Sequence, residues 1–201
     1  QFGNIGKNLA LASIPFGLSA LTNKAFAKDI TATPATPIGA LQFALTLEYL
    51  ENEFYAMALD SRLIPACENG GRDLKVLQQI AAHESDHVKF LIAGLGGTAS
   101  ANFVPKPTFD FTVGGAFNPF GDYPTFLALA QAFEDTGVRA YKGQAANLIT
   151  TPDLLTAALQ IHSVEARHAS EVRRLRGLKG WISNAERGAG MPAATQAVYD
   201  G

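Results

Sequence analysis

The chain has 201 residues, of which 47% are hydrophobic and 17% are charged, so it can bury a core and wholesale disorder is excluded. Sixteen lysines and arginines against 18 aspartates and glutamates give a net charge of −2, which argues against a surface that binds nucleic acid by neutralising phosphates. The single cysteine, Cys67, excludes an internal disulfide and a cysteine-based zinc site.

The N-terminal 30 residues resemble an export signal. Lys7 precedes an apolar stretch over residues 9–21, and Ala25-Phe26-Ala27 has the small residues of a cleavage site. We therefore expect residues 1–36 to be a signal-like segment with a linker, and the protein to be periplasmic or otherwise exported. The alternative is an accessory helix packed on the body of a cytoplasmic protein. No apolar run reaches the roughly 18 residues of a membrane-spanning helix.

Apolar residues that recur at steps of three and four predict four long helices, over residues 38–61, 72–93, 123–147 and 154–175. Short connections join the first pair and the last pair and make them antiparallel, whereas residues 95–122 form a long, phenylalanine-bearing connection in which we expect a short extended pair. Such a crossover lets the second and third helices run parallel. We thus predict an all-α four-helix bundle over residues 37–180, and a loop-rich tail over residues 181–201 with Trp181 as its anchor.

Each predicted helix carries acidic residues on its apolar stripe. Glu48 and Glu134 lie on the first and third helices, and the second and fourth carry Glu84-Ser85-Asp86-His87 and Glu165-Ala166-Arg167-His168. A Glu and a His three residues apart share one helix face. Nine glutamates and four histidines would give about 0.2 such Glu-x-x-His matches by chance, and two occur on apolar faces.

The two halves of the chain repeat this pattern. Glu48 precedes Tyr55 by seven residues, and Glu134 precedes Tyr141 by seven. The offset between the two Glu-x6-Tyr helices is 86 residues, and that between the two Glu-x-x-His helices is 81. The near-equal offsets indicate two helix pairs related by a pseudo-twofold axis.

Four inward glutamates and two histidines supply six metal ligands. The carboxylates carry up to four negative charges, which two divalent cations would neutralise. Without metal, this charge would be very costly in a core unless the groups were protonated. The pattern therefore predicts a dinuclear metal site.

Four segments carry a family resemblance: LEYLENEFY, HESDHVKFLIAGLGG, FEDTGVRAYKG and VEARHASEVRRLRG. They resemble the ferritin-like superfamily of di-iron and di-manganese bundles, and within it the ferritin-like domain family that includes bacterial and plant desiccation-related proteins. The resemblance implies two iron or manganese ions. It also implies that Tyr55 and Tyr141 lie near the metals, where they either contact the ligands or take part in redox chemistry. It implies these ligands: Glu48 and Glu134 as terminal carboxylates, Glu84 and Glu165 as bridging carboxylates, and His87 and His168 as one nitrogen each.

Two functions follow as hypotheses. The first is a redox protein whose substrate is O2 or H2O2. Its reaction would be ferrous oxidation, peroxide removal or catalase-like disproportionation. Its electron donor is unidentified, and a homodimer is the candidate assembly. The second is a non-catalytic desiccation or stress protein of the cell envelope, with a structural or empty metal site and the connection over residues 95–122 as its interaction surface. Lack of a fifth apolar helix argues against a 24-subunit storage shell.

Several residues have two interpretations. Glu51 rivals Glu48 as the ligand of the first helix, or both line the site; the seven-residue step to tyrosine favours Glu48. His83 is expected at the surface or in helix packing. His162 is either a partner of a ligand or a core histidine with satisfied hydrogen bonds, and Asp135 is solvated or lies near a ligand.

Overall fold

The computed structural model describes residues 36–65 and 71–200, so the signal-like segment and Cys67 lie outside the described residues. The elements are α4 (Pro37–Asp60), α5 (Arg72–Gly94), α6 (Tyr123–Gln144), α7 (Pro152–Leu175) and the short 3₁₀ helices η2 (Ala145–Leu148) and η3 (Ala193–Val198). None of the helices in the described ranges is long and apolar enough to cross a membrane.

Capping residues and prolines set where the long helices begin. The Thr36 hydroxyl accepts a hydrogen bond from the Gly39 amide at 3.0 Å, and an Asp122 carboxylate oxygen accepts one from the Thr125 amide at 2.9 Å. Both side chains satisfy amides that have no partner within the first turn. A proline stands in the first turn of α4, α6 and α7, where its missing amide hydrogen costs nothing.

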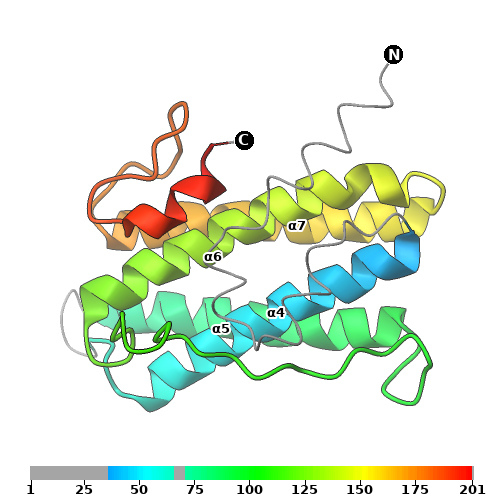
Figure 1. Cartoon of the computed structure of the whole chain (residues 1–201), viewed down its shortest axis with the longest axis horizontal. Coiled ribbons are helices and arrows are strands. Elements are labelled where there is room, and N and C mark those ends of the chain that lie inside the picture. The colour runs from blue at the N-terminus through cyan, green and yellow to red at the C-terminus, as the bar shows by residue number, and fades with distance from the viewer. Residues whose placement is uncertain (1–35, 66–70, 201) are drawn as a thin grey trace.

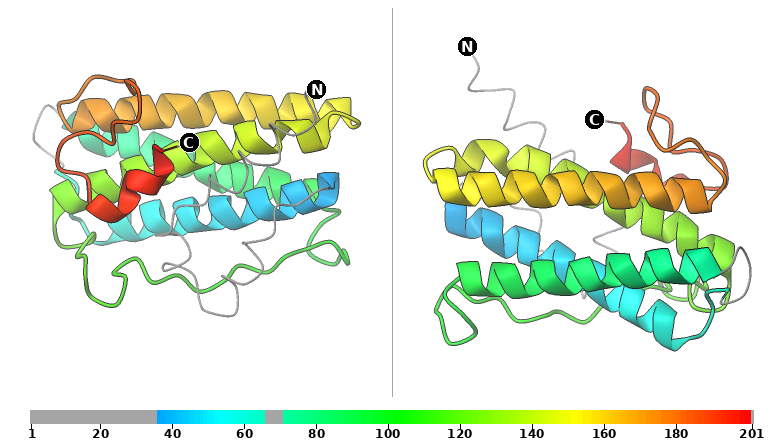
Figure 2. Two further views of the ribbon diagram at one scale, coloured as in Figure 1. Left: turned by 45° about the horizontal axis from the view of Figure 1, so that its top comes forward. Right: turned by 180° about the vertical axis from the view of Figure 1, so that it is seen from behind.

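The four long helices form the bundle that the sequence predicts (Figure 1). Helices α4 and α5 are antiparallel neighbours, and α6 and α7 form a second antiparallel pair. Helices α5 and α6 run in the same direction, because the connection over residues 95–122 returns along the length of the bundle (Figure 2). The all-α bundle with a long crossover between its second and third helices is therefore confirmed.

The crossover is held to the bundle by aromatic side chains. Phe109 and Phe111 are buried, and the Phe111 ring lies 5.2 Å from that of Phe54 on α4. The expected extended pair is absent from this described stretch. Asp110 turns the chain instead, because its carboxylate accepts hydrogen bonds from the amides of Thr112 (3.0 Å) and Gly114 (2.7 Å).

The C-terminal tail is anchored differently from the prediction. Trp181 is 65% exposed, so its assignment as the anchor was wrong. Met191, Val198 and Tyr199 are buried instead and form a small apolar cluster with alanines of α6. The Tyr199 hydroxyl also donates a hydrogen bond to Asp135 of α6 at 2.6 Å, which fixes the tail against this helix.

Candidate metal centre

The predicted ligand side chains meet in the middle of the bundle. Each of the four long helices contributes at least one buried glutamate, and α5 and α7 each add a buried histidine one turn further along. Four carboxylates at this depth need a compensating charge, because an isolated ionised carboxylate is very unfavourable in an apolar core.

The six side chains form two overlapping groups of potential ligands. The first group contains Glu48, Glu84, His87 and Glu165, and the second contains Glu84, Glu134, Glu165 and His168. Within each group the ligand atoms lie within 4.8 Å of one another. Glu84 and Glu165 belong to both groups, which is the arrangement expected of carboxylates that bridge two ions.

Three carboxylates surround the Nδ1 atom of His87 at nearly equal distances. This atom lies 3.1 Å from Glu48 Oε2, 3.2 Å from Glu84 Oε2 and 3.1 Å from Glu165 Oε1. A single N–H group cannot serve three acceptors. Ligand atoms at right angles around one ion, each bonded at about 2.1 Å, lie about 3 Å apart. The spacing therefore fits one cation at the centre of this group.

The second group repeats this arrangement around Nδ1 of His168. The atom lies 2.8 Å from Glu84 Oε1, 3.3 Å from Glu134 Oε2 and 3.7 Å from Glu165 Oε2. Glu84 and Glu165 thus direct one oxygen toward each histidine.

Buried atoms without hydrogen-bond partners converge on the same space. Among the described residues they include Oε1 of Glu84, Oε2 of Glu134, both carboxylate oxygens of Glu165, and Nδ1 of His168. Buried polar atoms are almost always satisfied, so a cluster of exceptions needs an explanation. Bound cations would supply it, and the residues present therefore fit a metal site.

The electrostatics of the cluster point the same way. Burial and the neighbouring Glu165 raise the pKa of Glu84 well above its usual range, and burial raises the pKa of Glu134 to about 7. Burial would lower the pKa of His87, but its hydrogen bonds to the carboxylates outweigh burial and raise that pKa to about 12. The pKa of His168 is also raised, because nearby carboxylates outweigh the effect of burial. Protons balance the charge here when cations do not.

Two buried tyrosines hold the terminal carboxylates from across the bundle. The Tyr55 hydroxyl of α4 donates to Glu134 Oε1 on α6, and the Tyr141 hydroxyl of α6 donates to Glu48 Oε1 on α4. The second oxygen of each glutamate faces a histidine. The tyrosines therefore lie beside the cluster, as the resemblance implies, and fix how each terminal carboxylate is turned.

A fifth carboxylate lines the site. Glu51 is 2% exposed, and its Oε2 has no hydrogen-bond partner. Burial and the charge of Glu165 raise its pKa well above the usual range. A Cβ atom on Gly137 would lie 3.2 Å from Glu51 Oε1, so glycine makes room for this carboxylate. Glu48 faces His87 while Glu51 lies beside Glu165, and both glutamates of α4 therefore line the site.

His83 is a site residue that the sequence reasoning missed. Its Nδ1 lies 2.9 Å from Nε2 of His168, and the two rings stack with centroids 5.2 Å apart. A neutral imidazole that binds metal through Nδ1 carries its proton on Nε2, so His168 would donate to His83. The available signal was the position of His83 four residues before His87, on the flank of α5 that meets α7.

For two further residues the structure excludes one of the two interpretations that the sequence left open. Asp135 is buried rather than solvated, since it is ion-paired with Arg173 of α7. His162 is not a core histidine with satisfied hydrogen bonds, because its buried Nε2 has no partner.

Two overlapping carboxylate–histidine groups inside a four-helix bundle are typical of bundle proteins that can hold metal ions in their core. A family model described as a ferritin-like domain matches residues 36–178, and the chain belongs to this family. Neither the comparison with curated proteins nor that with solved structures finds a significant match.

Proposed function

We propose that this protein binds two iron or manganese ions and uses them in a redox reaction with O2 or H2O2. The observation that carries the proposal is the sharing of Glu84 and Glu165 between two ligand groups, because two bridging carboxylates hold a pair of ions close together. Two such ions supply one electron each when bound, which with two protons reduces O2 to H2O2 or H2O2 to two water molecules.

The donor set supports iron or manganese over softer metals. The groups contain four carboxylates and one nitrogen for each ion, and carboxylates suit hard cations. The four carboxylates and two divalent cations balance in charge. Glu51 adds a fifth buried carboxylate, which gives the site an acid that can hold a proton beside the shared Glu165.

The chain's own residues prepare this site. Tyr55 and Tyr141 orient the terminal carboxylates, and His83 orients the ring of His168. Oxidative or desiccation stress in the cell envelope is the setting that the resemblance and the N-terminal segment suggest for this chemistry.

The first experiment is metal analysis of untagged protein purified from medium rich in iron and manganese. We expect about two ions per chain and consumption of O2 or H2O2 by the loaded protein. The double variant Glu84→Gln/Glu165→Gln should lose both ions and keep its helical content by circular dichroism. Glu53→Gln is the matched control, because Glu53 lies on the same bundle but pairs with Lys106 near the surface.

Lack of any transition metal, even after anaerobic addition of Fe(II), would refute the proposal. That result would favour a non-catalytic stress protein and direct attention to the crossover over residues 95–122 as its interaction surface. Metal bound equally by the wild type and the double variant would refute the assignment of the ligands.

A further inference from the structure

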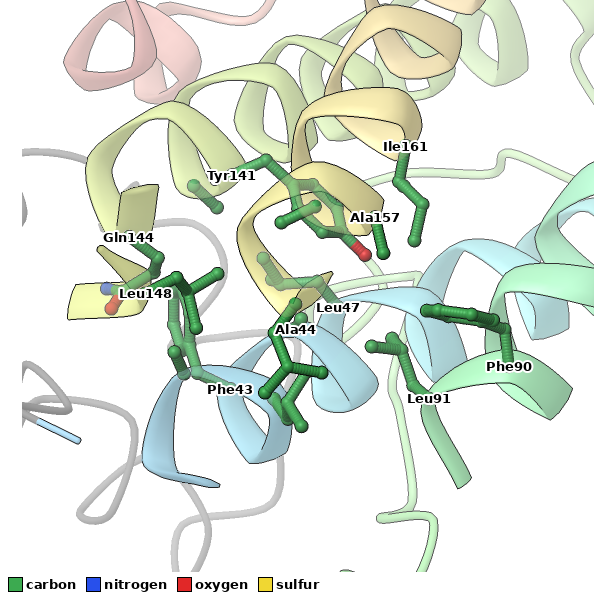
Figure 3. Close-up of a pocket in the computed structure, with 15 residues that line it drawn as sticks. Phe43, Ala44, Leu47, Phe90, Leu91, Tyr141, Gln144, Leu148, Ala157 and Ile161 are labelled. Atoms are coloured by element: carbon green, nitrogen blue, oxygen red, sulfur yellow. The ribbon is translucent and has the colours of Figure 1, made fainter. Parts of the chain in front are cut away.

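An apolar cavity opens at the end of the bundle where α4 and α7 begin and α5 and α6 end. Side chains from all four helices converge on it, among them Ala44, Leu91, Tyr141 and Ile161 (Figure 3). Its volume is about 20 Å³, which is room for one small molecule. The ring of Phe90, 46% exposed, also lines the cavity and places its edge at the protein surface.

The cavity lies one helical turn from the ligand group of His87. Ala44 is four residues before Glu48, Leu91 is four residues after His87, and Ile161 is four residues before Glu165. Residues four apart lie above one another on one helix face. The Tyr141 side chain forms part of the wall, and its hydroxyl donates to Glu48. A molecule in the cavity is therefore next to one half of the cluster.

In the other half of the bundle, larger side chains stand at three of the equivalent positions. The sequence offsets of 86 and 81 residues relate three alanines of the cavity wall to three large residues: Ala40 to Phe126, Ala140 to Phe54, and Ala158 to Leu77. Phe54, Phe126 and Leu77 are fully buried. The Phe54 and Phe126 rings stack with centroids 5.0 Å apart. The cavity is thus a property of these residues rather than of the bundle fold.

The chemistry of the wall selects an apolar occupant. Its polar side chains are Tyr141 and Gln144; the Tyr141 hydroxyl donates to Glu48, and the Gln144 side-chain oxygen accepts from Asn147 at 2.7 Å. Water or H2O2 would lose hydrogen bonds on entering, which is costly in an apolar site. Dioxygen has no hydrogen bonds to lose and is small enough for the space.

We propose that this cavity is a docking site for dioxygen that delivers it to the Glu48–His87 half of the cluster. The proposal rests on the proposed redox function and names its oxidant. With two Fe²⁺ ions bound, each would lose one electron, and the docked O2 would take both electrons with two protons and leave as H2O2.

Xenon tests the cavity without reference to activity, since it binds in small apolar cavities as dioxygen would. In crystals of the protein pressurised with xenon, we expect one atom between Ala44, Leu91 and Ile161. Ala158→Leu places here the side chain that Leu77 supplies in the other half, and it should abolish xenon binding. Ala44→Val is the second variant if Ala158→Leu does not fold. Ala56→Leu on the exposed face of α4 is the control and should keep the xenon.

Stopped-flow oxidation of protein loaded anaerobically with Fe(II) tests delivery. Ala158→Leu should slow the reaction with O2 roughly tenfold and leave the reaction with H2O2 and the Fe(II) content unchanged. Three results would overturn the proposal: no xenon in the wild type, an unchanged rate with O2, or equal slowing with both oxidants. If the wild type reacts with neither oxidant, the redox function itself is refuted, and the xenon result then describes an apolar gas site without a delivery role.

Discussion

The halves of the cluster around His87 and His168 share their ligand types and differ in what surrounds them. Beside the His87 half lies a cavity walled mainly by alanines, larger aliphatic residues and aromatic side chains. The opposite end is filled by packed phenylalanines, and the His168 half has an extra contact from His83. The two halves of the internal repeat thus have the same ligand residues but different residues around the ligands. Two ions in such a site would have equal ligands and unequal access to small molecules.

The largest expected effect is the loss of one bound ion when the terminal carboxylate of one half is replaced. Glu48→Gln and Glu134→Gln each remove one charge from one group, so each variant should bind one ion per chain where the wild type binds two. Calorimetric titration with Mn(II) gives the number of sites. Loss of both ions in either single variant would show that the halves do not bind independently.

Stability tests the difference in packing. Phe54 contacts four other phenylalanine rings and is fully buried, so Phe54→Ala should lower the free energy of unfolding by about 3–5 kcal/mol. Phe90→Ala at the edge of the cavity should cost less than about 1 kcal/mol, because that ring is half exposed. Urea unfolding of the metal-free variants measures both. Equal losses would contradict the contrast between a filled and an open end.

The contact between His83 and His168 should make the affinities of the two metal positions unequal. His83→Phe removes the acceptor for His168, and we expect weaker binding of one ion by about 10–100-fold while the other is unaffected. His83→Gln should restore part of the affinity through its amide oxygen. His162→Phe on α7 is the control, since no hydrogen bond joins His162 Nε2 to the cluster. An equal loss in both histidine variants would mean that His83 acts only in packing.

Proton competition gives the smallest expected effect. Burial raises the pKa of Glu134 to about 7, so this carboxylate holds a proton below neutrality and must release it to bind metal. Affinity should therefore fall by about tenfold as the pH drops from about 8 to about 6, for the proton of Glu134 alone. Mn(II) titrations at several pH values measure the slope, and a flat profile would contradict it.

The helices were predictable because burial follows one face of each. The stripe of α5, from Leu77 through Glu84 and His87 to Leu91, is buried throughout, as its period requires. Charged residues are unusual within such stripes, and their positions alone selected Glu84, His87, Glu165 and His168 as candidates, whereas they left Glu48 and Glu51 as alternatives on the first helix. The convergence of these side chains on one site adds geometry, while the metal-binding role itself stays a prediction.

Contacts between helices were not predictable in the same way. The meeting of His83 with His168 depends on how far α5 is shifted along α7, and no local pattern encodes that shift. The prediction for the C-terminal tail was wrong for a related reason. Trp181 is the largest apolar residue there, yet the tail is fixed by Tyr199 through its contacts with Gln131 and Asp135 on α6. Polar contacts of this kind leave no periodic trace in the sequence.

Neither helical hairpin contains a complete half of the site. The group around His87 takes Glu48 and Glu84 from the first hairpin but Glu165 from the second, and Tyr141 of the second hairpin holds Glu48 in place. A chain of half this length would complete the cluster only by pairing with a second copy of itself. The bundle therefore has the construction of a dimer within one polypeptide, and because its two halves are separate stretches of one sequence, a substitution such as Ala158→Leu changes one half alone.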